Sequence, residues 1–174
     1  MITIISSTNR EASKSLSVAK YYQSKLNALG IENQIADLQE IPDDFLTNGL
    51  YGTSGKNEVF NALRDKVQNA DALVFIVPEY NGSFPGILKL FIDGLRYPDC
   101  VKGKTAALCG ISAGPLGAAL GLSHLTDILN YLNCNVLAIK PRITNINKEF
   151  INEEFSNPII ISIIDDQINQ LTRV

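Results

Sequence analysis

The sequence predicts an α/β fold in which helices cover both faces of a parallel sheet. Short apolar, β-branched runs alternate along the chain with longer segments of helical period. The clearest run, residues 72–77 (ALVFIV), is apolar on both faces, which is typical of a parallel strand buried on two sides. No internal repeat, low-complexity tract or Pro/Gly-rich linker interrupts the 174 residues, so one domain over residues 1–174 is expected.

Five strands are expected, at residues 2–5, 31–38, 72–77, 105–111 and 135–139. The first helix is indicated by a stripe of apolar residues from Leu16 to Leu29, and Gly30 follows it as a favoured cap. Other helices are expected at residues 59–67, 85–95, 122–132 and 157–171, the last opening with Asn157-Pro158. Five β–α units predict a flavodoxin-like three-layer sandwich with a five-stranded parallel sheet in the order 2-1-3-4-5.

Composition excludes several classes of function. The net charge of −3 gives no basic surface for nucleic acid. No apolar run approaches the ~18 residues of a membrane span, and the start of the chain turns polar too soon for a signal peptide. Three scattered cysteines and one histidine form no metal motif. We therefore expect a cytoplasmic protein with free thiols and no metal ligands.

Ligands of doubly wound sheets bind beyond the carboxyl ends of the strands, so the loops there are the candidate site. The first loop, residues 6–15, carries five hydroxyl side chains and Arg10 before a helix N-terminus. Hydroxyls, a guanidinium and free backbone N–H groups suit a phosphate monoester. The alternative is that Ser13 or Ser15 only caps the helix and Arg10 is a solvated charge. No GxGxxG is present, which disfavours a dinucleotide-binding turn.

The second loop follows the third strand and contains Asn81-Gly82, a pair that supports left-handed, tightly turned backbone. Its N–H groups can then point at the edge of a planar ligand, with Tyr80 as an aromatic face. The third loop, residues 112–118, is rich in small residues that permit close backbone approach to a flat ring. An ordinary βα turn is the alternative in each case. Together the three loops predict a site for a phosphorylated, flat ligand with polar edges, and FMN fits that description.

A family resemblance rests on three motifs. The string Pro78-Glu79-Tyr80-Asn81-Gly82-Ser83-Phe84-Pro85-Gly86, followed by Leu88-Lys89 and Ile92-Asp93, is similar to P-E-Y-N-x-S-x-P-G-x-L-K-N-x-I-D of the NADPH-dependent FMN reductase family. Leu90 replaces the asparagine of that signature. This family includes quinone, chromate and azo-dye reductases.

The other two motifs match the first and third loops. The first loop resembles the family's G-S-x-R-x-x-S turn: Arg10 and Ser13 match, Thr8 replaces the first serine and Ser7 replaces the glycine. Ser15 falls where a further polar FMN contact is often found. The family's S-A-G-x-x-G-G resembles the third loop, which matches at Ser112, Ala113, Gly114 and Gly117, with Ala118 in place of the last glycine.

The resemblance implies bound FMN, reduction by NADPH or NADH, and transfer of electrons to a small acceptor such as a flavin, quinone, azo compound or metal oxyanion. It also implies a homodimer or homotetramer. Residues 78–82 would flank the isoalloxazine, and the first loop would hold the 5′-phosphate. The cofactor-binding residues expected on this basis are Thr8, Arg10, Ser13, Ser15, Pro78, Glu79, Tyr80, Asn81, Gly82, Ser112, Gly114 and Gly117.

A flavin carries the hydride chemistry itself, so we assign no catalytic residue to the protein. The alternative function is a flavodoxin-type electron carrier with FMN but no substrate turnover. A response-regulator domain is disfavoured, because Ser6-Ser7 and Val77-Pro78 stand where that class needs acidic residues. We expect His124 to be a packed or interface residue and the cysteines to be inert. Tyr51, in a glycine-flanked loop, is a candidate cover for the flavin.

Overall fold

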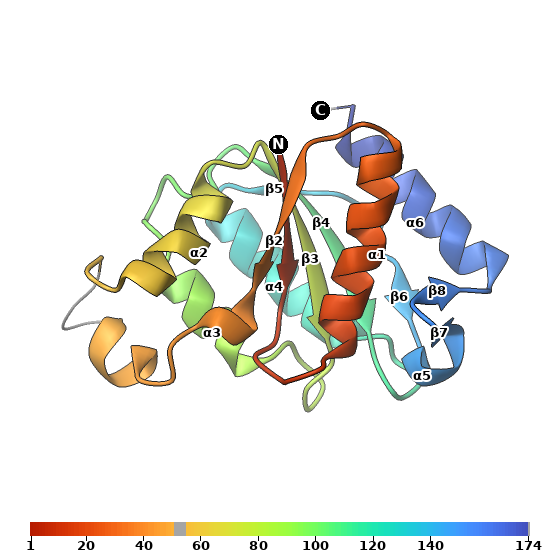
Figure 1. The fold of residues 1–174 in the computed structure, drawn as a ribbon, viewed down its shortest axis with the longest axis horizontal. Coiled ribbons are helices and arrows are strands. Elements are labelled where there is room, and N and C mark those ends of the chain that lie inside the picture. The colour runs from red at the N-terminus through yellow and green to blue at the C-terminus, as the bar shows by residue number, and fades with distance from the viewer. Residues whose placement is uncertain (51–54, 174) are drawn as a thin grey trace.

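A computed structural model describes residues 1–50 and 55–173, and Figure 1 shows its ribbon. A parallel sheet has the order β2-β1-β3-β4-β5, with β6 paired to β4, so the predicted 2-1-3-4-5 order is confirmed. The strands are β1 Ile2–Ser6, β2 Asn33–Asp37, β3 Ala72–Pro78, β4 Thr105–Ile111, β5 Asn135–Val136 and β6 Arg142–Ile143.

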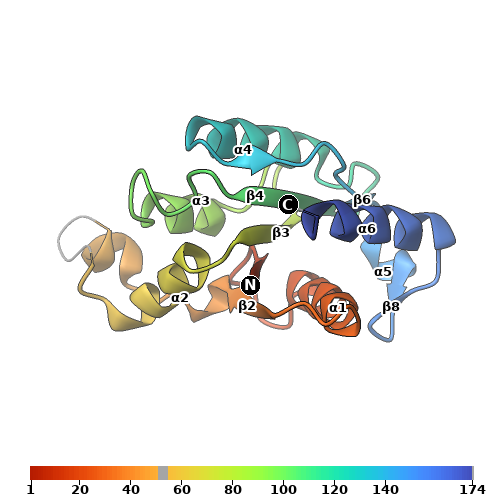
Figure 2. The same cartoon turned by 90° about the horizontal axis from the view of Figure 1, so that it is seen from above.

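Helices lie on both sides of this sheet (Figures 1 and 2). One face packs on α2 Glu58–Gln68, α3 Gly86–Asp93 and α4 Ala119–Tyr131. The other face packs on α1 Lys14–Ala28 and α6 Pro158–Leu171.

The central strand β3 explains the two cores. Its side chains alternate, with Leu73, Phe75 and Val77 in one core and Ala72, Val74 and Ile76 in the other. Every residue from Ala72 to Val77 is buried. The continuous apolar run of the sequence is therefore a strand that lies between two helical layers, as predicted.

The helix boundaries follow the capping residues of the sequence. The Asn157 side chain accepts the Ile159 N–H at the start of α6, and Pro158 is the first helical residue, which confirms the predicted opening. Gly30 follows α1 with a φ of +70°, a conformation that glycine adopts without steric cost. The predicted helix over residues 85–95 is shorter in the structure, because Pro85 stands outside it and Gly94 ends it.

The fifth strand was predicted as one segment, residues 135–139, and this is wrong. The chain pairs with β4 at Asn135–Val136, leaves the sheet, and returns as β6 at Arg142–Ile143. The edge segment uses six residues, from 136 to 142, to pass along the four residues of β4 from 106 to 110. The two extra residues of the edge segment must therefore bulge out of the sheet.

Gln167 of α6 fills the gap that this bulge leaves in the ladder. Its amide nitrogen donates to the carbonyl oxygens of Leu108 and Ile139, at 2.9 and 2.8 Å. Its oxygen accepts the Tyr22 hydroxyl at 2.9 Å. Gln167 and Tyr22 are fully buried, so each of these polar groups depends on the others for a partner.

We predict that Gln167→Leu lowers the free energy of unfolding by about 2–4 kcal/mol, because it leaves several buried polar groups unpaired. Urea unfolding followed by circular dichroism measures the change. Gln170→Leu, at an exposed position of the same helix, is the control and should change stability by less than about 0.5 kcal/mol. Equal effects of the two substitutions would contradict the role given to Gln167.

The segment between β6 and α6 contains elements that were not predicted from the sequence. It forms the short helix α5 Ile146–Glu149 and a hairpin of β7 Phe150–Ile151 and β8 Glu154–Phe155. Tyr21 of α1 packs edge-on against Phe150 and Phe155, which fixes the hairpin beside α1. No helix among the described residues has the length and apolar character needed to cross a membrane.

Candidate binding site

A cavity of about 470 Å³ lies at the carboxyl edge of the sheet. It is bounded by the loops that follow β1, β3 and β4, the three loops chosen from the sequence, and by the start of α5. Its lining residues are Thr8, Arg10, Glu11, Ala12, Ser13, Lys14, Ser15, Pro78, Glu79, Tyr80, Ile111, Ser112, Ala113, Ile146 and Asn147. Eight of the twelve predicted site residues are therefore brought together here.

The N-terminus of α1 forms one wall of the cavity. Ser13 is the helix cap, since its Oγ accepts the Leu16 N–H at 3.2 Å. It also lines the cavity, so its part in cofactor binding stays a prediction. Ser15 is different. It is 1% exposed, it lines the cavity, and its Oγ has no hydrogen-bond partner among the described residues. A buried hydroxyl of this kind ordinarily has a partner, so a ligand oxygen would complete the site.

Two cations border the same wall. Arg10 is exposed, and its side chain has no partner within the described part of the chain. Lys14 Nζ lies 3.5 Å from the Phe150 carbonyl oxygen and 5.8 Å from the centre of the Phe150 ring. The helix N-terminus adds partial positive charge. The wall thus offers positive charge, a free hydroxyl and backbone N–H groups, which together suit an anion such as a phosphate.

A hydrogen bond joins the first loop to the second. Thr8 Oγ1 and the Tyr80 hydroxyl are 2.9 Å apart, and Thr8 Oγ1 also accepts the Arg10 N–H at 3.4 Å. Thr8 is buried, whereas Tyr80 is 40% exposed. This bond ties the hydroxyl of Tyr80, a lining residue of the cavity, to the first loop.

The second loop contains a tight turn at Asn81-Gly82. Tyr80 and Ser83 exchange two backbone hydrogen bonds of 2.9 Å, and the φ angles of Asn81 and Gly82 are +50° and +72°. Two positive φ angles are the mark of a type I′ turn, which Asn-Gly favours. The turned backbone inferred from this pair is confirmed. The turn uses the N–H groups of Tyr80 and Ser83, and the N–H groups of Asn81 and Gly82 have no protein acceptor in the described residues.

The third loop is shaped by Ser112. Its Oγ donates to the Gly114 carbonyl at 2.7 Å and accepts the Gly117 N–H at 2.8 Å, so the hydroxyl is engaged within its own loop. Gly117 has a φ of +58°, and a Cβ there would lie 2.9 Å from Cβ of Arg142. Gly117 is therefore required by packing against β6 as well as by the turn.

Four predicted residues, Asn81, Gly82, Gly114 and Gly117, do not line the cavity, and their part in binding stays a prediction. The sequence interpretation missed Asn147 and Ile146. Their segment is docked on the third loop, because the N–H groups of Asn145 and Ile146 donate to the carbonyls of Gly114 and Ser112. A signal existed: this segment also follows a strand of the sheet, so its loop reaches the same edge.

His124 is exposed, where a packed residue was one expectation, and its Nδ1 lies 2.9 Å from the Ser83 hydroxyl. Tyr51 lies outside the described residues. Within residues 1–50 and 55–173, no three His, Cys, Asp or Glu side chains gather closely enough to hold a metal ion.

The three cysteines are buried and free. Burial raises the pKa of the Cys109 thiol to about 12 and that of Cys134 to about 11, and it also raises the pKa of Cys100. Since the thiolate is the nucleophile, these side chains are unreactive at neutral pH.

We predict that a thiol reagent such as dithionitrobenzoate labels fewer than one cysteine per folded chain within minutes at pH 7, and all three in guanidinium. The released chromophore at 412 nm gives the count. Rapid labelling of the folded protein would show that one of the three thiols is exposed and reactive.

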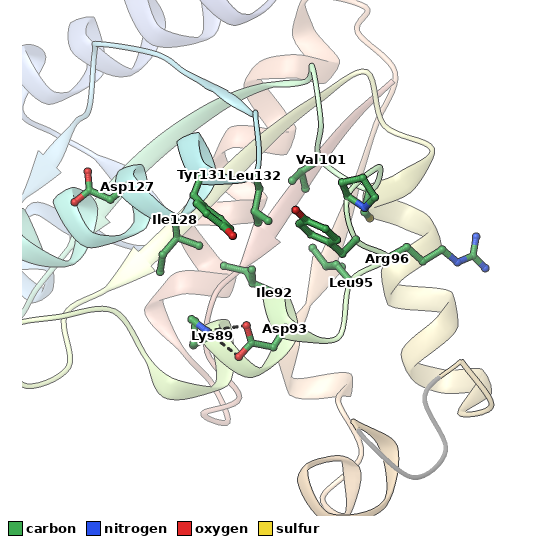
Figure 3. Close-up of a pocket in the computed structure, with 13 residues that line it drawn as sticks. Lys89, Ile92, Asp93, Leu95, Arg96, Val101, Asp127, Ile128, Tyr131 and Leu132 are labelled. Atoms are coloured by element: carbon green, nitrogen blue, oxygen red, sulfur yellow. Dashed lines mark hydrogen bonds and ion pairs between the residues drawn. The ribbon is translucent and has the colours of Figure 1, made fainter.

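A second cavity of about 570 Å³ lies away from these loops, between α3, α4 and the segment 95–101. Figure 3 shows its mostly apolar lining, with Ile92, Leu95, Ile128 and Leu132 facing one another across it. It contains none of the predicted site residues. Its chemistry is that of an apolar groove, and the smaller cavity is the candidate site because its lining carries the cations and the unpaired hydroxyl.

Comparison with known proteins identifies the class to which this fold and site belong. The sequence profile of the family described as NADPH-dependent FMN reductase matches residues 1–145, and the chain belongs to this family. A solved flavoenzyme NAD(P)H:(acceptor) oxidoreductase from Paracoccus denitrificans has a similar fold, with a TM-score of 0.79 and 23% identity over 99% of this chain and 97% of that one.

Two relatives show the similarity of this chain to particular proteins. A 2-hydroxy-1,4-benzoquinone reductase of a Burkholderia species is 38% identical over 79 residues, 44% of this chain and 43% of its own. An NAD(P)H-dependent FMN reductase of Pseudomonas aeruginosa is 36% identical over 110 residues, 62% of this chain and 58% of its own. The matches thus span about half the length of these relatives.

Proposed function

We propose that this protein is an FMN-containing oxidoreductase that takes hydride from NADPH or NADH and passes electrons to a small acceptor such as a quinone, flavin, azo compound or metal oxyanion. The observation that carries the proposal is the unpaired, buried Ser15 hydroxyl beside Arg10 at the N-terminus of α1, in a member of the FMN reductase family. The donor set fits a phosphate monoester, and the adjoining loops suit a planar ring.

Each wall of the cavity has a separate task in this proposal. The α1 N-terminus, Ser15 and Arg10 would hold the 5′-phosphate, and Lys14 adds charge nearby. The N–H groups of Asn81 and Gly82 would face the polar edge of the ring, because they alone in their turn lack a protein acceptor. FMN, when bound, accepts hydride from the nicotinamide and delivers electrons to the acceptor. The protein binds, orients and shields, and no side chain is required as acid or base.

The alternative is a flavodoxin-type electron carrier without turnover of its own. The family match favours the enzyme. The two are separated by steady-state oxidation of NADPH in the presence of a quinone.

We predict that the purified protein, incubated with FMN, shows the absorbance bands of oxidised flavin, that NADPH bleaches them, and that added quinone restores them. Absorbance under anaerobic conditions follows each step. Bound FMN with no bleaching by NADPH or NADH would favour the carrier, and a protein that fails to bind FMN would contradict the whole proposal.

The phosphate wall is tested by substitution. Arg10→Ala and Ser15→Ala should each weaken FMN binding by about 2 kcal/mol, roughly 30-fold, since each removes a hydrogen bond to a charged group. Quenching of FMN fluorescence gives the dissociation constant. Ser17→Ala, in the same helix but outside the cavity lining, is the control. If both site variants bind FMN as tightly as the wild type, the phosphate does not bind at this wall of the cavity.

We also propose that the chain is a cytoplasmic homo-oligomer, a homodimer or a tetramer built from such dimers. The groove between α3 and α4 is the candidate interface (Figure 3). Tyr97 and Tyr131 line it and are 74% and 77% exposed, the largest exposures among the large apolar side chains of the described residues. Arg96 and Asp127 lie at its opposite ends, so a two-fold axis through the groove would set one copy's Arg96 against the other copy's Asp127. The buried free cysteines are consistent with a reducing compartment.

Tyr131→Glu should convert the dimer to a monomer, because it buries a charge in the apolar centre of the proposed interface. Sedimentation velocity over a range of concentrations measures the mass. Ile159→Glu, at an exposed apolar position of α6 on the other side of the sheet, should leave the dimer intact. A wild-type monomer, or loss of the dimer in Ile159→Glu alone, would overturn this interface.

A further inference from the structure

The Asn81-Gly82 turn has contacts with α4 on both of its sides. Before the turn, Glu79 Oε2 accepts the backbone N–H of Ala118, the residue at the start of α4, at 2.9 Å. After the turn, the Ser83 hydroxyl and His124 Nδ1 are 2.9 Å apart. Residues 118 and 124 are separated by six positions, so the first two turns of α4 hold both ends of the segment.

The backbone of α4 approaches the turn closely between these two bonds. A Cβ at Gly121 would lie 2.8 Å from the Ser83 carbonyl carbon and 2.9 Å from the Phe84 nitrogen, a separation that real side chains do not reach. Only glycine permits this packing. The segment is thus bonded to α4 on both sides of the turn, and directly after the turn its backbone packs closely on Gly121.

The start of α4 has no cap of its own. Ala118 is in the left-handed region, with a φ of +57°, and offers no side-chain acceptor. Glu79, from a different loop, supplies a carboxylate to this helix N-terminus, where negative charge is favourable. One contact therefore caps the helix and fastens the turn.

We propose that Glu79 and His124 are positioning residues that clamp the Asn81-Gly82 turn onto α4, so that its two free N–H groups are held ready for the edge of the flavin ring. Neither side chain is required to touch the flavin. The role of the clamp in flavin binding rests on the proposed function, whereas the clamp itself is a property of the ligand-free chain. The two can therefore fail separately.

The exposed side of the clamp gives the cleanest test, because substitution at His124 leaves the core intact. Ser83→Ala, His124→Ala and the double variant form a double-mutant cycle for FMN binding. We expect each single change to weaken binding about threefold to tenfold, the range for one hydrogen bond. The double change should cost no more than either single one. His124→Asn, whose amide takes the place of Nδ1, should restore most of the affinity, and Ser123→Ala is the exposed neighbouring control.

Glu79 is tested by comparing two variants. Glu79→Gln keeps an oxygen that can accept the Ala118 N–H, so it should weaken FMN binding less than Glu79→Ala does. Glu79→Ala removes the acceptor and should weaken binding by tenfold or more. If Glu79→Ala unfolds α4, the double-mutant cycle of Ser83 and His124 still tests whether the turn is clamped onto α4.

Hydrogen exchange in the absence of FMN separates the clamp from the function. Peptides covering residues 79–84 should exchange faster in His124→Ala than in the wild type or in Ser123→Ala, with an unchanged melting temperature. Faster exchange in a chain that binds no FMN would support the clamp and refute the proposed function. Unchanged exchange, or strictly additive losses in the cycle, would overturn the clamp.

Discussion

Burial of the sheet on both faces is the constraint on which the rest of the structure depends. The backbone N–H and C=O groups of β1, β3 and β4 are hydrogen-bonded between neighbouring strands, and the side chains of these strands fill two cores. Free polar groups therefore occur where the strands end. The three loops at the carboxyl edge and the start of α5 provide such polar groups, and the candidate site is built almost wholly from these segments. A rigid sheet thus positions loops that have no regular structure of their own.

The features that could be predicted from the sequence are those decided by local chemistry. The apolar run of β3, the Asn157-Pro158 cap and the Asn81-Gly82 turn each depend on the residues themselves, and the structure confirms them. The parallel sheet follows from the alternation of strands and helices, because parallel neighbours need crossover connections, and the simplest doubly wound order is the one found. The cavity could be located for the same reason, as the place where the ends of β1, β3 and β4 meet.

The features that could not be predicted depend on partners distant in the chain. The break between β5 and β6 needs Gln167 to supply hydrogen bonds from α6, and no pattern within residues 135–143 reveals such a donor. The bond from Ser83 to His124 joins residues 41 positions apart. The Glu79 carboxylate belongs to a motif whose appearance suggests a ligand contact, yet its recorded partner is the Ala118 N–H, 39 positions away. The sequence can single out such residues as candidates, but it does not predict which distant groups they bind.

The arrangement of charge explains why one anionic group can be held at a defined place. Helices α1, α3 and α4 follow strands β1, β3 and β4, so each begins at the carboxyl edge of the sheet, where its N-terminus attracts negative charge. Glu79 occupies the N-terminus of α4 with a carboxylate from the protein. At α1 the cap is the neutral Ser13, and the side chains of Ser15 and Arg10 have no protein partner in the described residues. Because the N-terminus of α1 lines the cavity and carries these unpaired side chains, it is the helix end best suited to an anionic ligand there. In the proposed complex, the planar portion of the ligand would extend toward the turn that α4 holds.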